Sequence, residues 1–227
     1  MRYETPMPRT WDPTAVDPET ALERLIAGNR RFVAGKRRKI LVTPADVADA
    51  PQQPFAVILG CSDSRVPIET VLDQGVGDLF VIRVAGHVVN PSQIGSVEFA
   101  VAQFGTRLVL VLGHTRCGAV NATLRRLVEG ETSESRHITA ITDRIAPNIA
   151  PLISVIDPVA RLEQAVVANV RASMNHLCHG SQQLDELTQN GRVQVRGAVY
   201  HLETGKIEVL DGDCRDAGHP VSTSAAQ

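Results

Sequence analysis

Three short runs of apolar residues, separated by stretches of helical periodicity, constrain the fold of this chain more than any other feature. The runs lie at residues 55–59, 79–82 and 108–112. Strands that are apolar throughout are typical of a parallel sheet that helices cover on both faces. Helical periodicity indicates helices at 68–74, 93–104 and 117–128. This alternation predicts an α/β fold with a mostly parallel central sheet and flanking helices.

The amino-terminal part of the chain predicts a helical arm. Asp17-Pro18-Glu19 combines a capping aspartate, a first-turn proline and a first-turn acid, which is typical of a helix start. Apolar residues then recur at helical spacing over 21–33. We therefore expect a short extension at 1–16 followed by a helical arm at 17–50.

The carboxyl-terminal part predicts two more helices and a β-hairpin. The helices are expected at 135–145 and 158–177. Strand character at 193–200 and 207–210, with turn residues between, predicts the hairpin. The polar residues at 212–227 are expected to form a disordered tail. We find no repeat and no linker, so the whole chain is interpreted as a single domain, 1–227.

The composition excludes several classes of partner. The net charge is −2 at pH 7, so the chain as a whole does not attract nucleic acid or an anionic membrane. A local basic cluster at 30–39 is interpreted as a solvated or subunit-facing surface. No apolar run approaches the roughly 18 residues of a membrane span, and residues 1–13 lack the pattern of a signal peptide. A cytoplasmic protein is therefore expected.

The chain has four cysteines, Cys61, Cys117, Cys178 and Cys214. In a chain of this length and expected compartment, thiols or metal ligands are favoured over a disulfide framework. Cys178 lies between His176 and His179 at the end of a predicted helix. This cluster has the residue types of metal ligands, but we interpret it as a helix terminus with a partly buried thiol.

Two strand ends carry the residues that suggest a function. The first strand is followed by Cys61-Ser62-Asp63-Ser64-Arg65, and the third by Gly113-His114-Thr115-Arg116-Cys117-Gly118. In open α/β sheets, functional groups gather beyond the carboxyl ends of the strands. Two cysteines and a histidine suit a tetrahedral Zn²⁺ ion and leave a fourth position for water, as in catalytic zinc sites. His-x-x-Cys alone is weak evidence, whereas the two motifs together are far more specific.

The paired motifs resemble the signature of the β-class carbonic anhydrases. The resemblance extends to 78–86, 95–101 and the hairpin around Glu203-Thr204-Gly205. It implies an enzyme of the carbonate dehydratase class, with Zn²⁺ held by Cys61, His114 and Cys117. The implied reaction is the reversible hydration of carbon dioxide to bicarbonate and a proton by zinc-bound hydroxide. The resemblance also implies a homo-oligomer, either a dimer or a dimer of dimers.

The resemblance suggests roles for two residues beside the metal. Zinc binds deprotonated sulfur, so the two cysteines are expected as thiolates and His114 as a neutral ring. Asp63 is expected to accept a hydrogen bond from zinc-bound hydroxide, while Arg65 holds its carboxylate by a bidentate pair. In some family members this aspartate instead binds the zinc as a fourth ligand, and the sequence does not decide between the two states.

Three further residues match family positions that contact substrate. Gln52 has the offset of a glutamine that contacts substrate or bicarbonate, and by resemblance it could serve the zinc of another subunit. Phe80 matches an apolar wall of the carbon dioxide pocket, although an aromatic residue in an apolar strand is as often part of the core. Gly118 allows close backbone approach at a helix start, where a main-chain amide could orient bicarbonate.

Two other functions fit the same residues. Relatives with this fold hydrolyse carbonyl sulfide or carbon disulfide, which are linear molecules like carbon dioxide, and nothing in the motifs excludes them. The second alternative is a non-catalytic, zinc-containing bicarbonate sensor. An intact Asp63–Arg65 pair without an evident fourth protein ligand argues against the sensor.

Overall fold

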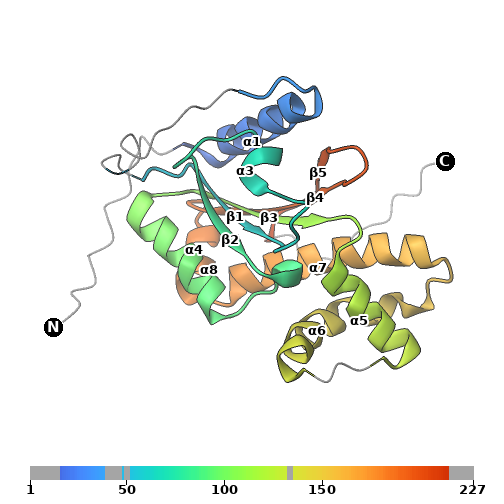
Figure 1. Ribbon diagram of the computed structural model, residues 1–227. Helices are drawn as coiled ribbons and strands as arrows, with labels where there is room; N and C mark the ends of the chain where they lie inside the picture. The colour runs from blue at the N-terminus through green and yellow to red at the C-terminus, as the bar shows by residue number, and fades with distance from the viewer. Residues whose placement is uncertain (1–15, 39–47, 49–51, 132–134, 215–227) are drawn as a thin grey trace, which may run out of the picture.

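The computed structural model describes residues 16–38, 48, 52–131 and 135–214, whose strands form one five-stranded sheet (Figure 1). The strand order is β2-β1-β3-β4-β5. Strands β1 to β4 pair in parallel, and β5 pairs with β4 in the antiparallel direction. The bounds are Ala56–Gly60 (β1), Leu79–Arg83 (β2), Leu108–His114 (β3), Gln194–Tyr200 (β4) and Ile207–Val209 (β5). The predicted α/β fold with its carboxyl-terminal hairpin is confirmed.

Helices cover both faces of the sheet (Figure 1). One face carries α1 (Pro18–Val33) and α3 (Ile68–Val71). The other carries α4 (Pro91–Phe104), α5 (Gly118–Glu129), α7 (Pro158–His179) and α8 (Gln182–Gln189), while α6 (Arg136–Ile149) packs on α5 and α7. Short 3₁₀ segments lie at Ala85–His87 and Ala150–Ser154. Alternate residues of β1 enter the two cores, so the strand is buried on both faces, as its continuous apolar run predicts.

The helix starts predicted from the sequence are confirmed at α1 and α7. The Asp17 carboxylate accepts a hydrogen bond from the Thr20 amide at 3.0 Å. Asp157 accepts from the amides of Val159 and Ala160. Each carboxylate satisfies amides that have no partner inside the helix, and the proline at the first helical position has no amide to satisfy.

The buried side chain of Asn29 attaches α1 to the domain. Its amide nitrogen donates to the carbonyls of Val71, at the end of α3, and of Gly205, in the β4–β5 turn. Its oxygen accepts from the Ile207 amide. One side chain thus joins three segments that are distant in the sequence. Residues 39–47 and 49–51 of the predicted helical arm lie outside the described residues.

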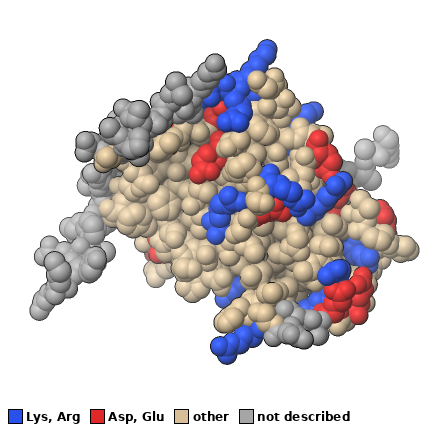
Figure 2. All heavy atoms as spheres, in the orientation of Figure 1, with Lys and Arg blue, Asp and Glu red and all other residues tan. Residues whose placement is uncertain are grey.

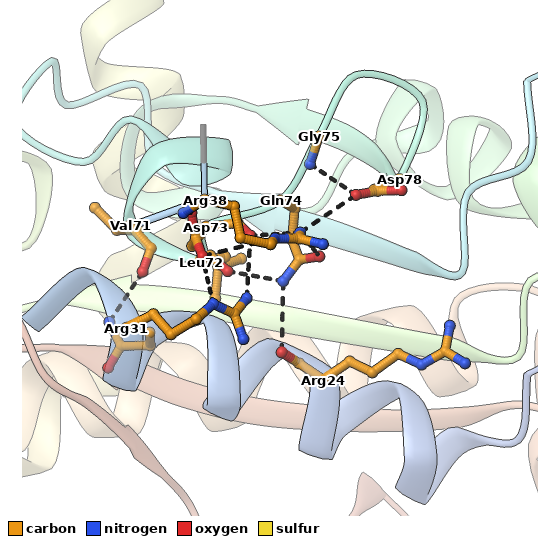
Figure 3. A network of polar contacts seen from close by, with 10 residues as sticks. Arg24, Arg31, Arg38, Val71, Leu72, Asp73, Gln74, Gly75 and Asp78 are labelled. Atoms are coloured by element: carbon orange, nitrogen blue, oxygen red, sulfur yellow. Dashed lines mark hydrogen bonds and ion pairs between the residues drawn. The ribbon is translucent and has the colours of Figure 1, made fainter. Parts of the chain in front are cut away.

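Two arginines of the otherwise exposed basic cluster provide a second attachment of the α1 segment to the domain. Arg31 and Arg38 both pair with Asp73, whose side chain is only 2% exposed (Figure 3). The Asp73 carboxylate also accepts from the backbone amide of Arg38 at 3.0 Å. A buried carboxylate needs such partners, because an unpaired charge away from water is costly. These two arginines therefore have a structural role and do not simply form a solvated or subunit-facing surface.

Three helices differ from the prediction, and one of them is α6, which runs to Ile149 and not to the predicted end at 145. α3 ends at Val71, before the predicted end at 74, because Asp73 adopts a left-handed backbone conformation with φ of 49°. This conformation ends the helix and leaves Asp73 next to Arg31 and Arg38. α8 was not expected from the sequence. Only Leu184 and Thr188 of its eight residues are buried, so its apolar periodicity is too short to indicate a helix.

The expectation that the cysteines are thiols or metal ligands is wrong for one pair. Cys178, near the end of α7, forms a disulfide with Cys214 across a Cα–Cα separation of 6.3 Å, and both residues are buried. The bond fixes residues 212–214, which the sequence assigned to a disordered tail; residues 215–227 lie outside the described residues. Sequence reasoning missed the bond because it forms only when the chain returns from β5 to α7.

Candidate metal centre

The candidate metal centre lies where the strand order reverses. From β1 the chain passes to β2 on one side, and then to β3 on the other side of β1. The carboxyl ends of β1 and β3 are therefore neighbours at a topological switch point, where open α/β sheets bind ligands. Cys61 directly follows β1, and His114 is the last residue of β3.

Cys61, His114 and Cys117 come together as the sequence predicts. Their ligand atoms all lie within 4.8 Å of one another. The three residues are 6%, 0% and 1% exposed, respectively. Across the part of the chain that the structure describes, no other group of three histidine, cysteine or acidic side chains is placed to hold a metal ion. Two sulfurs and a ring nitrogen form a donor set that suits Zn²⁺.

The His114 ring is oriented for metal binding. Its Nδ1 atom lies 2.9 Å from the Thr115 carbonyl oxygen. Because a carbonyl oxygen only accepts, Nδ1 carries the proton and Nε2 presents a lone pair. Nε2 is buried and has no hydrogen-bond partner among the described residues. A buried acceptor without a partner is costly, and a metal ion beside the two sulfurs would satisfy it.

The electrostatics of the three residues also favour a cation. The adjacent Cys117 thiol lowers the pKa of Cys61, against the opposing effect of burial. The same contact raises the pKa of Cys117, and burial adds to that rise. Burial favours the neutral form of His114, but the neighbouring Cys61 sulfur outweighs it and raises the pKa of His114. Deprotonation of both buried sulfurs side by side requires a positive charge between them, which a divalent ion would supply.

A strained turn connects two of the candidate ligands. Arg116, between His114 and Cys117, has φ of 55°, a left-handed conformation that is uncommon outside glycine. The turn is held from the neighbouring strand, since the Thr115 amide donates to the Tyr200 carbonyl at 2.9 Å. α5 begins directly after Cys117, so the positive end of its dipole favours a thiolate there.

Asp63 and Arg65 form the bidentate pair that the sequence suggests. Arg65 donates from Nε to Oδ1 at 2.9 Å and from Nη2 to Oδ2 at 2.7 Å, and its backbone amide adds a third bond at 2.9 Å. The hydrogen bonds from Arg65 lower the pKa of Asp63 to about 2, so the carboxylate is ionised at neutral pH. Oδ2 lies 3.8 Å from His114 Nε2. The carboxylate is thus beside the candidate ligands but bound to Arg65.

Two supporting residues received no role in the sequence analysis. Arg83, the last residue of β2, donates to the carbonyls of Cys61 at 3.0 Å and Asp63 at 2.7 Å. The Gly86 amide donates to the Cys61 sulfur at 3.4 Å. The signal for Arg83 was available: in the parallel sheet Gly60 pairs with Arg83, so this side chain ends beside the loop that follows β1.

The three proposed substrate contacts are not gathered at one centre within the chain. Gln52 is exposed and precedes β1, whereas Cys61 follows that strand. Phe80 pairs in register with Val57, roughly 13 Å along the strand from Cys61. Its ring packs on two phenylalanines of α4. Gly118 alone lies at the centre, as the exposed first residue of α5.

Fold and site together define a class of protein. A parallel α/β sheet holds two cysteines and a histidine at its switch point, with an aspartate–arginine pair beside them. Three protein ligands with a nearby ionised carboxylate are the arrangement of a catalytic metal site, because a fourth ligand position remains for solvent or substrate. The structure therefore has a site of mixed sulfur and nitrogen donors that could hold one metal ion.

Comparison with known proteins agrees with this class. The carbonic anhydrase family profile matches residues 56–207. The chain is 36% identical to carbonic anhydrase 2 of Mycobacterium tuberculosis over 201 residues, which cover 86% of this chain and 94% of the relative. It is 37% identical to the carbonic anhydrase of Mycolicibacterium smegmatis over 201 residues, which cover 85% and 93%.

Solved structures give the same result. The β-carbonic anhydrase CafA of Aspergillus fumigatus is 28% identical, with a TM-score of 0.61 over 70% of this chain and 76% of the relative. Coccomyxa β-carbonic anhydrase, solved with acetazolamide, shares the fold with a TM-score of 0.65 over 87% and 96%, at 23% identity. The chain belongs to the β-class carbonic anhydrase family, and its assignment to the carbonate dehydratases is confirmed.

Proposed function

We propose that this chain is a zinc enzyme that catalyses the reversible hydration of carbon dioxide to bicarbonate and a proton. The observation that carries the proposal is the buried, unpartnered Nε2 of His114 beside the sulfurs of Cys61 and Cys117. These three residues would hold the ion, with both sulfurs as thiolates. The relatives at 36% and 37% identity are named carbonic anhydrases, which supports the same reaction here.

The side chains around the ligands suit this chemistry. When bound, zinc supplies the Lewis acidity that makes water a nucleophile near neutral pH. The Asp63 carboxylate, kept ionised and aimed by Arg65, accepts a hydrogen bond from that water and directs its lone pair toward carbon dioxide. A hollow of about 250 Å³ lies on this side, lined by Arg65, Arg116, Tyr200, Leu202 and Glu203.

Zinc content and carbon dioxide hydration, measured on one preparation, test the proposal. We expect stoichiometric zinc and rapid hydration, and a Cys61→Ser variant should lose both, because the ion then lacks a thiolate ligand. Carbonyl sulfide and carbon disulfide are assayed beside carbon dioxide. Faster turnover of either sulfur compound would make it the substrate instead. Bound zinc with no turnover of any of the three would favour the bicarbonate sensor.

We further propose that the chain acts as a homo-oligomer, either a dimer or a dimer of dimers. Large apolar side chains are exposed at Ile156 (94%), Val159 (65%), Ile138 (52%) and Phe99 (52%). A subunit interface over these side chains would remove them from water. Structural relatives from Sordaria macrospora are described as tetrameric, and at 24% identity this likeness bears on the fold alone. Light scattering of the purified chain measures its mass in solution.

A second subunit would also give Gln52 and Phe80 their expected roles. Both lie away from Cys61 of their own chain, so they would contact substrate at the zinc of the partner chain. Gln52→Ala should then raise KM for bicarbonate while zinc content stays unchanged. An unchanged KM would show that this side chain does not contact substrate.

We propose no nucleic-acid partner and no membrane partner for this chain. On the face shown in Figure 2, basic and acidic side chains are interspersed. None of the described helices is long and apolar enough to cross a bilayer. We propose a cytoplasmic location, where a disulfide such as Cys178–Cys214 is unusual. Alkylation of thiols in intact cells before lysis tests whether that bond forms in the native compartment.

A further inference from the structure

Behind the candidate metal centre, a buried polar cluster joins the 85–87 turn to α7. The Gly86 amide donates to the Cys61 sulfur at 3.4 Å. The Gly86 carbonyl accepts from Asn169 Nδ2 at 2.9 Å. We propose that Asn169 is a positioning residue for the metal centre: it fixes the Gly86 backbone so that the amide stays bonded to the Cys61 sulfur. This inference rests on the zinc centre proposed above.

The turn needs this support because its backbone is strained. Gly86 and His87 are consecutive left-handed residues, with φ of 64° and 42°. For a non-glycine residue this conformation costs on the order of 1–3 kcal/mol and persists only where the surroundings hold it. A Cβ atom at position 86 would lie 2.8 Å from Ile145 Cδ1, so the close packing of the turn also requires glycine there.

Each polar group of the cluster can be assigned as a hydrogen-bond donor or acceptor. The Ser173 hydroxyl donates its single proton to the His87 carbonyl at 3.1 Å, so its oxygen accepts from His87 Nδ1, 3.2 Å away. His87 Nε2 is then unprotonated and faces Asn169 Nδ2 at 3.5 Å. The Asn169 oxygen accepts from Asn148 at 3.3 Å. The Asn169 amide nitrogen therefore points toward the turn, where it donates to both acceptors.

The neutral ring of His87 is consistent with this assignment. Burial lowers the pKa of His87 to about 4. Asn169 and Ser173 are 1% and 3% exposed, so bulk water does not compete for their hydrogen bonds. The cluster is buried and its described polar groups are paired, which makes it a rigid support for the turn.

The hydrogen bond to sulfur has a chemical consequence at the metal. A donor on a thiolate withdraws electron density from sulfur, so the thiolate neutralises less of the charge of a bound zinc ion. With two thiolate ligands the formal charge of the site is near zero, and each such hydrogen bond helps to keep the ion a useful Lewis acid. Asn169 affects the electron density on the Cys61 sulfur through Gly86, without contacting a metal ligand or the substrate.

Metal binding and spectroscopy test the inference without relying on activity. We expect Asn169→Ala to weaken zinc affinity about 10-fold in chelator competition, since loss of an outer partner commonly has an effect of this size. In cobalt-substituted protein the sulfur-to-metal charge-transfer band should move to longer wavelength, because sulfur becomes a better electron donor. Asn169→Leu, which keeps the volume but not the donor, should behave alike. Leu177→Ala, in the same helix, removes only apolar packing and should leave the affinity and the band unchanged.

Wild-type zinc affinity and band position in folded Asn169→Ala or Asn169→Leu would overturn the inference. If neither variant folds, wild-type protein loaded with a spin-active cadmium isotope carries the test. A scalar coupling between the Gly86 amide proton and cadmium supports the hydrogen bond to sulfur, and its absence overturns the inference. Failure of wild-type protein to bind zinc or cobalt at all would instead refute the proposed metal centre, so the two failures are distinguishable.

Discussion

Two aspartates of this chain bind arginine side chains in different settings. Asp63 pairs with Arg65, two residues away in the same loop. Asp73 pairs with Arg31 of α1, which lies 42 positions earlier in the chain, and with Arg38, which lies 35 positions earlier (Figure 3). The first pair is complete within one loop. The second exists only after α1 has docked on the domain.

The surroundings of the two carboxylates separate their roles. The Asp73 side chain is 2% exposed and enclosed by its partners. The Asp63 side chain is 16% exposed, its partner Arg65 is 53% exposed, and one carboxylate oxygen lies 3.8 Å from His114 Nε2. Ion pairing alone therefore does not indicate function. The position of the carboxylate relative to the candidate ligands does.

The largest effect is expected on hydration activity, from a substitution of Asp63 beside the candidate metal centre. We expect Asp63→Ala to lower kcat/KM for carbon dioxide hydration about 100-fold, because water then lacks its positioned acceptor. Zinc content should not change, since Asp63 lies outside the ligand group. Hydration is measured by stopped flow and zinc by elemental analysis. Activity close to wild type would remove Asp63 from the proposed mechanism.

The second prediction concerns Asp73 and the stability of the fold. Asp73→Ala should lower the free energy of unfolding by about 2–3 kcal/mol, measured by urea denaturation, because charged hydrogen bonds are lost and partly buried guanidinium groups stay unpaired. Asp73→Asn should cost less, since asparagine tolerates the left-handed backbone and still accepts a hydrogen bond.

An exposed ion pair provides the matched control for this prediction. Asp143 pairs with Arg126 at 2.6 Å, and its side chain is 56% exposed. Asp143→Ala should change the free energy of unfolding by less than about 1 kcal/mol. Equal costs at Asp73 and Asp143 would contradict a structural role for the buried network. In all three variants the zinc-loaded enzyme should keep its kcat when it is folded.

The third prediction sharpens the comparison through the geometry of the arginines. Arg65 binds both carboxylate oxygens of Asp63, whereas Arg31 binds one carboxylate oxygen of Asp73 and, at 3.4 Å, its backbone carbonyl. Lysine cannot reproduce a bidentate fork. Arg65→Lys should therefore lower kcat about 10-fold, while Arg31→Lys should lower the free energy of unfolding by less than about 1 kcal/mol and leave kcat unchanged. The reverse pattern would show that the two pairs have been assigned the wrong roles.

The smallest expected effect concerns pH. The hydrogen bonds of Arg65 depress the pKa of Asp63 to about 2, below its usual value of 3.8. A depressed pKa stabilises the fold above the unfolded value, and this contribution is lost as pH falls through the folded value. Asp63 therefore stays ionised well below neutrality, and the activity ratio of wild type to Asp63→Ala should be constant from about pH 9 to about pH 6. A ratio that shrinks toward pH 6 would show that the carboxylate titrates near neutrality.

Much of the fold and of the candidate site follows from local sequence. The apolar runs before Cys61 and His114 predict buried parallel strands, because a strand covered on both faces has no polar side to show. Strand direction then brings the two motifs to one edge of the sheet. The bidentate Asp63–Arg65 pair also follows from its motif, since both side chains belong to one short loop.

The missed features share a physical cause. Asn169 lies 83 residues from Gly86, and Cys178 lies 36 residues from Cys214, so these pairs form only when helix α7 has packed. Likewise, the burial of Asp73 depends on docking of α1.

The residues themselves determined the strands, the three candidate metal ligands and the carboxylate beside them, because each is marked by an apolar run or a motif of a few consecutive residues. Only the tertiary structure decided which arginines are structural, which cysteines are bonded and what holds the backbone behind Cys61. Those contacts join segments that are far apart in the sequence. The segments come together only when the whole chain packs, so no short sequence pattern predicts these contacts.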